Sequence, residues 1–196
     1  MTRHVISAAL LGVFFVSALG LRPLLHRLRT GKWGINGLSG RIGSIEWWGG
    51  ATFIVSIALA PLALVLPAFE TPSLAFSLVL AIGGLITTLV AQSAMGASWR
   101  IGVDAREQTS LVTGGLFSVV RNPIFTGMLS FATGLAVLWP NVASLASALA
   151  LFVAVELQVR FVEEPYLAST HGAAWSNWAS RVGRFVPLFG RVRSET

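Results

Sequence analysis

Long apolar segments separated by short polar ones make up most of this chain. Residues 5–21 form the first apolar run, and stretches without a formal charge follow at residues 47–69 and 71–99. Each of these two stretches exceeds the roughly 20 residues that a helix needs to cross the hydrocarbon core of a bilayer. A further charge-free stretch, residues 122–155, is too long for one crossing, and a Pro-Asn pair at residues 140–141 divides it into a hairpin. The pattern predicts an all-α polytopic membrane protein with about five transmembrane helices.

We expect two parts that form one integrated domain. Residues 1–98 hold three transmembrane helices and their connecting loops, and residues 99–196 hold a polar loop, the transmembrane hairpin and a C-terminal segment. In the third span, small residues recur at four-residue intervals at Gly83, Thr87 and Ala91, which predicts a stripe where a neighbouring helix packs closely.

Composition supports the membrane interpretation. Hydrophobic residues make up 54% of the chain and charged residues 11%, and the mean hydropathy is +0.73. Soluble domains carry about 25% charged residues. The chain has no cysteine, which excludes disulfides, thiolate metal sites and cysteine nucleophiles. The net charge of +6 comes from basic residues between the apolar runs, so it reflects membrane topology and not a nucleic-acid partner.

The basic residues also predict the orientation. A secretory signal would carry its positive charge before residues 5–21 and a small-residue cleavage site after them, whereas here most of the charge follows, so we expect a retained span. With five spans, all of the 14 Lys and Arg except Arg3 fall on the side that holds the C-terminus. The positive-inside rule assigns that side to the cytoplasm and the N-terminus to the outside.

The first polar cluster that can carry chemistry is the start of the hairpin. Asn122 and Pro123 are typical of a helix start, because Asn is a good N-cap and Pro suits the first helical position. The N-terminus of a helix can bind a carboxylate or a phosphate, although a purely structural helix start fits these residues as well. Arg121 precedes this turn and also fits a role as a topology or headgroup charge.

The second polar cluster follows the last span. At 100° per residue, Glu156, Arg160, Glu163 and Glu164 fall on one helical face. Charges at the end of a span are costly unless they are paired or exposed. An intrahelical pair between Arg160 and Glu164 is the structural explanation. The functional one is a carboxylate that binds a cationic ligand group while the arginine steers an anionic group.

The C-terminal residues predict an amphipathic segment. Trp175, Trp178, Val182, Phe185 and Phe189 recur at near-helical spacing, with arginines between them. We expect this segment to lie against the cytoplasmic membrane interface.

Four motifs in this order resemble the C-terminal half of the isoprenylcysteine carboxyl methyltransferase family and its phospholipid methyltransferase relatives. They are Thr109-Ser110-Leu111-Val112, Gly115-Leu116-Phe117, Arg121-Asn122-Pro123-Ile124-Phe125, and Arg160 with Glu163-Glu164 and Leu167. The resemblance covers roughly residues 99–187 and implies a small helical membrane enzyme that uses S-adenosylmethionine.

The resemblance also implies roles for individual residues. The cofactor would contact a loop, an aromatic residue, the helix start and two carboxylates: Thr109, Ser110, Leu111, Val112, Phe117, Asn122, Pro123, Ile124, Phe125, Glu163 and Glu164. Glu164 would receive the amino group of the cofactor with Glu163 in support, and Arg160 would face the substrate as the catalytic residue. Methyl transfer of this kind needs no metal, because it depends on positioning two ligands and excluding water.

The methyl acceptor stays open between a carboxyl, a hydroxyl and an amine on a lipophilic or lipid-linked molecule. If a base is needed, Asp104, Glu107 or His171 could take the proton, although His171 also suits an interfacial position. Two other functions remain: a membrane reductase that uses a nicotinamide cofactor, and a non-catalytic membrane scaffold. The sequence does not indicate an oligomeric state.

Overall fold

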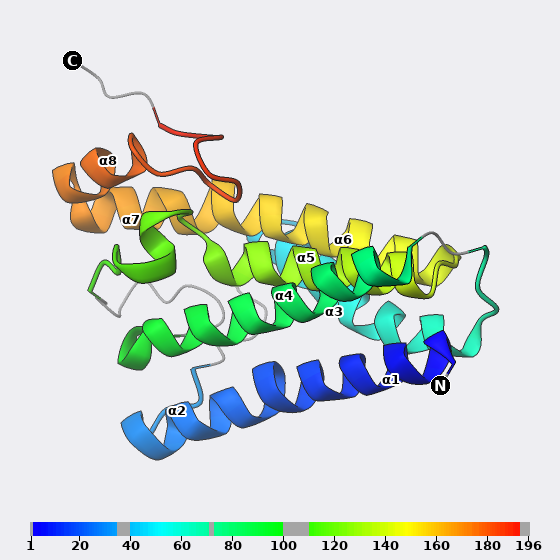
Figure 1. Ribbon diagram of the computed structural model, residues 1–196. Coiled ribbons are helices and arrows are strands. Elements are labelled where there is room, and N and C mark those ends of the chain that lie inside the picture. Colours follow the sequence, from blue (N-terminus) through cyan, green and yellow to red (C-terminus); the bar gives the residue numbers. More distant parts are fainter. Residues whose placement is uncertain (1, 35–39, 71–72, 100–109, 193–196) are drawn as a thin grey trace.

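A computed structural model describes residues 2–34, 40–70, 73–99 and 110–192 of the chain (Figure 1). The longer helices lie side by side as one bundle. In chain order the helical elements are α1 (Arg3–Phe14), η1 (Phe15–Leu21), α2 (Arg22–Thr30), α3 (Ile45–Leu62), η2 (Ala63–Val65), α4 (Leu74–Ala94), η3 (Gly96–Ser98), η4 (Gly115–Ser118), α5 (Pro123–Leu138), α6 (Val142–Gln158), η5 (Val159–Glu163), α7 (Glu164–His171) and α8 (Ala173–Ala179). The elements η1 and η5 are π-helical, and the other three are short 3₁₀ helices.

Within the described residues, four helical stretches are long and apolar enough to cross a membrane. They are Arg3–Thr30, Ile45–Val65, Leu74–Ala94 and Val142–His171. The predicted all-α polytopic membrane fold is thereby confirmed. The remaining expected span corresponds to α5, which has 16 residues. At 1.5 Å per residue it reaches about 24 Å, less than the ~30 Å of a typical hydrocarbon core. The number of five spans therefore stays a prediction.

The first helical stretch continues past the apolar run into the basic residues. Arg22 is buried, and its guanidinium donates to the carbonyl oxygens of Gln92 (2.8 Å) and Gly96 (3.0 Å). The same group lies 5.0 Å from the ring centroid of Trp99. The guanidinium of Arg22 thus holds the first helical stretch against the end of α4.

The closest helix pair is α4 with α5. A Cβ at Gly127 would stand 2.6 Å from Thr88 Oγ1 and 2.7 Å from Gly84 O, so the backbones approach where both helices carry glycine. The predicted stripe was wrong at Gly83, where a Cβ would meet nothing within 4 Å. The contact face runs through Gly84 and Thr88, one residue further along.

Asn141 divides the hairpin as predicted. Its Oδ1 accepts from Ser144 N (3.0 Å), and Ser144 Oγ accepts from Asn141 N (2.9 Å), which forms a capping box at the start of α6. Asn141 Nδ2 also donates to Ala63 O (2.8 Å), so the turn is fastened to the end of α3.

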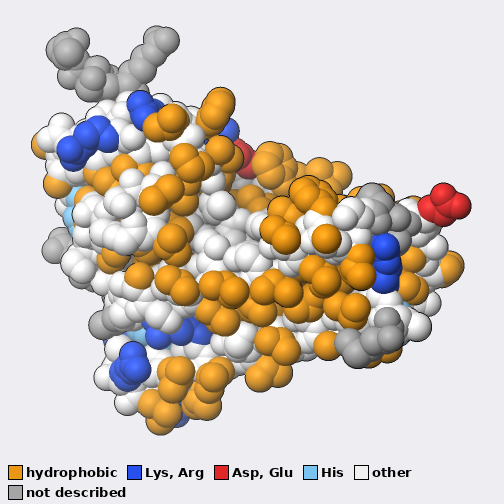
Figure 2. All heavy atoms as spheres, in the orientation of Figure 1, with side chains coloured by type: hydrophobic (Ala, Val, Ile, Leu, Met, Phe, Trp, Pro, Cys, Tyr) orange, Lys and Arg blue, Asp and Glu red, His pale blue; other side chains and the backbone are white. Residues whose placement is uncertain are grey.

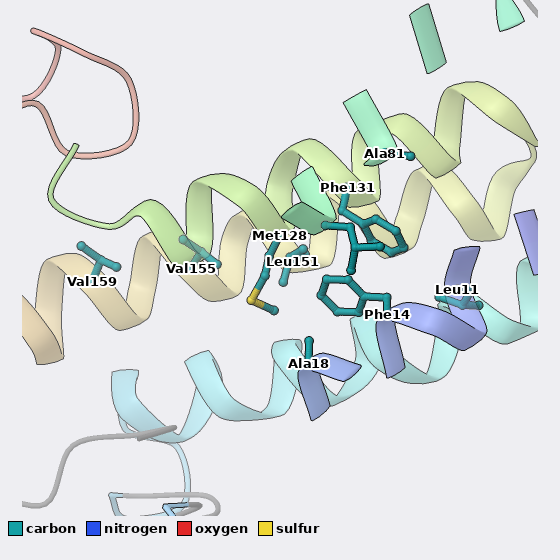
Figure 3. Close-up of a cluster of buried hydrophobic side chains, with 10 residues drawn as sticks. Leu11, Phe14, Ala18, Ala81, Met128, Phe131, Leu151, Val155 and Val159 are labelled. Carbon is teal, nitrogen blue, oxygen red and sulfur yellow. The ribbon is translucent and has the colours of Figure 1, made fainter. Parts of the chain in front are cut away.

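The core lies where α1 meets the hairpin (Figure 3). Phe14 of α1 stacks on Phe131 of α5, with 4.3 Å between the ring centroids. Met128, Leu151 and Val155 complete this part of the cluster. The first helix therefore packs against the first arm of the hairpin, α5, through two stacked aromatic rings.

The near-helical spacing of apolar residues in the C-terminal segment does not correspond to one continuous helix. Helical structure ends at Ala179, at the end of α8, and the chain continues without a helix to Val192. Trp175 and Trp178 are 7% exposed each and pack with Phe117 in a second buried cluster. These two tryptophans therefore face the protein interior, because α8 folds back onto the loop before α5.

Candidate active site

A cavity with a volume of about 460 Å³ lies between α3, α4, α5 and α6, at the end of the bundle that carries α7 and α8. Most of its lining is apolar or aromatic. The polar and charged side chains in the lining are those of Glu46, Gln92, Ser110, Arg121, Asn122, Gln158 and Glu163. Ligand sites in proteins typically have volumes of roughly 300–1,000 Å³ and combine apolar walls with a few polar groups. Size and chemistry both make this cavity the candidate active site.

The start of α5 forms one wall of the cavity. Pro123 occupies the first helical position, as the sequence predicts, and Asn122 lies at the N-cap. The side chain of Asn122 makes no capping hydrogen bond to α5, and its Nδ2 donates to Arg184 O (3.2 Å). The backbone N–H of Asn122 donates to the same carbonyl (3.1 Å). Asn122 thus fastens the C-terminal segment to the cavity wall.

Beside this wall lies a buried cluster of two arginines and one carboxylate. Glu164 Oε1 accepts from Arg121 Nη2 (2.6 Å), Arg121 Nε (3.2 Å) and Arg184 Nε (2.9 Å), and Glu164 Oε2 accepts from Arg184 Nη2 (2.7 Å). The side chains of Arg121 and Glu164 are 2% and 10% exposed. The hydrogen bond with Glu164 raises the pKa of Arg184 above its ordinary value. The cluster therefore stays charged and joins α5, α7 and the C-terminal segment.

Arg121 uses the rest of its guanidinium on backbone carbonyls. Its Nη1 donates to Ala179 O (3.0 Å) and Val182 O (2.6 Å), and its Nη2 donates to Gly190 O (3.0 Å) as well as to Glu164. A guanidinium has five N–H donors. These bonds occupy all of them, so Arg121 has no donor left for a ligand.

A π-helical turn, η5, separates the two charges that the sequence places on one face. The prediction of one common face assumed a regular α-helix. Instead, α6 ends at Gln158 and the wider π-helical turn η5 follows. Glu164 faces the bundle, whereas the side chain of Arg160 is 51% exposed and pairs with Glu156. Of the two explanations offered for this cluster, the intrahelical pair between Arg160 and Glu164 is therefore wrong, and Arg160 pairs one turn in the other direction.

Most residues of the expected cofactor site line the cavity. They are Ser110, Leu111, Val112, Phe117, Asn122, Pro123, Ile124, Phe125 and Glu163. Glu164 and Arg160 are not among the lining residues. Thr109 lies outside the described residues, as do Asp104 and Glu107. The structure thus brings together the loop, the helix start and one of the two adjacent carboxylates.

The aromatic side chains of α7 and α8 differ in their access to the cavity. Trp178 reaches the lining, and its Nε1 donates to Phe117 O (3.1 Å). His171 and Trp175 do not line the cavity, and each has a buried ring nitrogen without a hydrogen-bond partner. His171 is therefore separated from the cavity in this conformation.

Sequence reasoning missed the wall that α3 and α4 supply. Glu46, Gly49 and Phe53 come from α3, and Gln92 comes from α4. Gln158 at the end of α6 was also missed. Gln92 and Gln158 could have been identified from the sequence as candidate lining residues, because each is an uncharged polar residue near the end of an apolar run. The α3 residues carry no motif that would distinguish them from ordinary packing.

Comparison with known protein families identifies the family of this chain. The phospholipid methyltransferase family model matches residues 72–174. Comparison with curated proteins found no match. The matched region includes α4, the hairpin, α7 and most residues of the cavity lining. Because the match spans slightly more than half of the 196 residues, the chain belongs to the phospholipid methyltransferase family.

Proposed function

We propose that the protein binds S-adenosylmethionine in the cavity and transfers its methyl group to a lipophilic acceptor. Family membership indicates a methyltransferase that acts on a lipid-related acceptor. The observation that carries the finer proposal is the cavity itself. Nine of the residues expected to contact the cofactor come from separate stretches of the chain and line it together: Ser110, Leu111, Val112, Phe117, Asn122, Pro123, Ile124, Phe125 and Glu163.

The lining suits the chemical groups of this cofactor. Phe117, Phe125 and Trp178 offer aromatic faces, which attract a sulfonium cation without competing as nucleophiles. Glu163 offers a carboxylate for the amino group of the cofactor. When bound, S-adenosylmethionine supplies an electrophilic methyl group, and the protein contributes by holding both ligands in line and excluding water.

We assign different tasks to the two adjacent carboxylates. Glu163 lines the cavity and is our candidate for direct contact with the cofactor. Glu164 is a positioning residue, because its oxygens accept from Arg121 and Arg184 and thereby fix the start of α5. This assignment reverses the order that the resemblance implies, in which Glu164 is the direct contact.

The charge of the described lining favours an acceptor that is not anionic. Among the lining residues that the structure describes, Arg121 is the one cation, and its N–H donors are all in use. Glu46 and Glu163 are carboxylates. Arg160 is exposed and pairs with Glu156, so it does not line the cavity. We therefore propose an amine acceptor over a carboxylate, with Glu46 as a group that can accept the proton an ammonium must lose.

Calorimetric titration of the purified protein in lipid nanodiscs tests the cofactor. We expect S-adenosylmethionine to bind and NADPH not to bind. Glu163→Gln should weaken S-adenosylmethionine binding, and Glu156→Gln, in the exposed pair with Arg160, serves as the matched control. NADPH binding without S-adenosylmethionine binding would support the reductase instead, and folded protein that binds neither would support the scaffold.

Transfer of a labelled methyl group into fractionated lipids tests the acceptor. We expect label in lipids that carry a primary or secondary amine and none in lipid-linked carboxylates. Alkali-labile label would indicate a methyl ester and would contradict the amine assignment while leaving the methyltransferase assignment in place.

A further inference from the structure

The C-terminal segment carries an apolar tip, residues 185–189, that the bundle leaves exposed. Val186, Leu188 and Phe189 are 54%, 67% and 74% exposed. The backbone closes the tip into a compact turn, because Arg184 N donates to Phe189 O (2.8 Å) and Phe189 N donates to Val186 O (3.1 Å). Three large apolar side chains are thus held outward by an ordered turn.

The residues that lead into the tip run parallel to those that lead into α5, and the tip begins beside the first turn of this helix. Val120 and Gly183 form a parallel bridge, and Arg121 N donates to Gly183 O (2.7 Å). Further along, Thr126 Oγ1 donates to Phe185 O (2.9 Å). Thr126 lies in the first turn of α5, so the tip begins about one helical pitch, ~5 Å, past the start of this apolar helix and lies on the outside of the bundle. Interfacial membrane segments bury their apolar faces to a depth of roughly 5–10 Å.

Two exposed basic side chains flank the tip. Arg181 precedes it and Arg191 follows it. Figure 2 shows apolar and basic side chains next to each other at the corner of the molecule that the C-terminal segment occupies. Arg184 also lies nearby, but its guanidinium is engaged in hydrogen bonds with Glu164. Basic residues near a membrane surface attract anionic lipids, and apolar residues between them enter the acyl region.

We propose that residues 181–191 form an interfacial anchor for anionic phospholipid. In this anchor the tip lies among the acyl chains, while Arg181 and Arg191 bind anionic headgroups. The proposal does not depend on methyl transfer. The anchor is nevertheless connected to the cavity, because the same segment supplies Val182 O and Gly190 O as acceptors for Arg121 in the cavity wall.

The absence of cysteine allows a direct test, because a single introduced cysteine can be labelled without background. Leu188→Cys carries an environment-sensitive fluorophore, and Asn177→Cys, at an exposed position of α8, is the matched control. Val186→Cys is a second tip variant in case Leu188→Cys does not fold. Each labelled protein is placed in nanodiscs of phosphatidylcholine with or without phosphatidylglycerol, using lipids brominated on the acyl chain as quenchers.

We expect the tip label to lose more fluorescence than the Asn177 label, and to lose still more when phosphatidylglycerol is present. The extra loss should disappear in the double substitution Arg181→Gln and Arg191→Gln. Equal quenching of the tip and control labels would overturn the membrane anchor. Quenching of the tip that does not depend on phosphatidylglycerol would overturn the anionic lipid. A tip label shielded from both brominated lipid and aqueous iodide, in a particle that holds two protein copies, would show a protein interface instead.

Discussion

Replacing Glu164 with Gln separates a positioning role from direct cofactor binding. The carboxylate accepts four hydrogen bonds, from Arg121 Nε and Nη2 and from Arg184 Nε and Nη2. Gln retains one acceptor oxygen but puts an N–H group where Glu164 Oε2 accepts from Arg184. It also removes the counter-charge of two arginines, of which Arg121 is 2% exposed. The substitution therefore leaves buried positive charge uncompensated.

The expected loss of stability follows from this geometry. Removing one partner of a buried ion pair costs about 3–5 kcal/mol. For a chain of this length, each kcal/mol lowers Tm by about 2–4 °C, so Glu164→Gln should lower Tm by about 6–20 °C. Intrinsic fluorescence during heating can follow unfolding, because the chain holds seven tryptophans. Glu156→Gln is the control, since its pair with Arg160 is half exposed and such pairs contribute at most about 1 kcal/mol.

The cofactor measurement completes the experiment. If Glu164 is a positioning residue, the affinity for S-adenosylmethionine should fall in Glu164→Gln together with Tm. Glu163→Gln should instead lower the affinity without the large loss of Tm that Glu164→Gln causes, because Glu163 lines the cavity and does not neutralise the buried Arg121. An unchanged Tm with weakened cofactor binding in Glu164→Gln would refute this reasoning, because Glu164 would then act on the ligand and not on the wall.

Four further substitutions address the helix packing, the cap of α6 and the exposed arginine. Gly84→Ala should destabilise the protein by about 1–3 kcal/mol, because the new Cβ would meet the backbone of α5, whereas Gly83→Ala, in open space, should leave Tm unchanged or raised. Asn141→Ala removes the capping box of α6 and should cost about 1–2 kcal/mol, measured as a lower Tm. Arg160→Ala should leave both Tm and the affinity for S-adenosylmethionine close to wild type, because Arg160 pairs at the surface with Glu156. A loss of turnover alone in Arg160→Ala would indicate that the arginine contacts the acceptor.

Local signals in the sequence predicted the helices and the hairpin. Apolar length predicts a span because the thickness of the membrane sets it, and the Pro-Asn pair predicts the turn because both residues act on their own backbone. The face that each span buries was not predictable in the same way. The α4 helix is apolar all round, so hydropathy does not distinguish Gly84, which packs against α5, from Gly83, which is exposed.

The candidate site was likewise predictable in part, where its residues form local motifs. The loop residues Ser110 to Val112 and the α5 start could be predicted because they form ordered motifs. The partners of Glu164 could not, because Arg121 and Arg184 are 43 and 20 residues away and helical spacing does not extend that far. The sequence also conceals the π-helical turn η5, which rotates Glu164 away from the face of Arg160.

The bonds of Arg121 also set an order of assembly during synthesis. Its donors reach Gly190, which is 69 residues later in the chain. At about 5–20 residues per second, the ribosome needs roughly 3–14 s to make that stretch after Arg121 has been added. During this interval both arms of the hairpin can enter the membrane while Arg121 still lacks its carbonyl partners. The cavity wall is therefore completed only after both arms of the hairpin have been made.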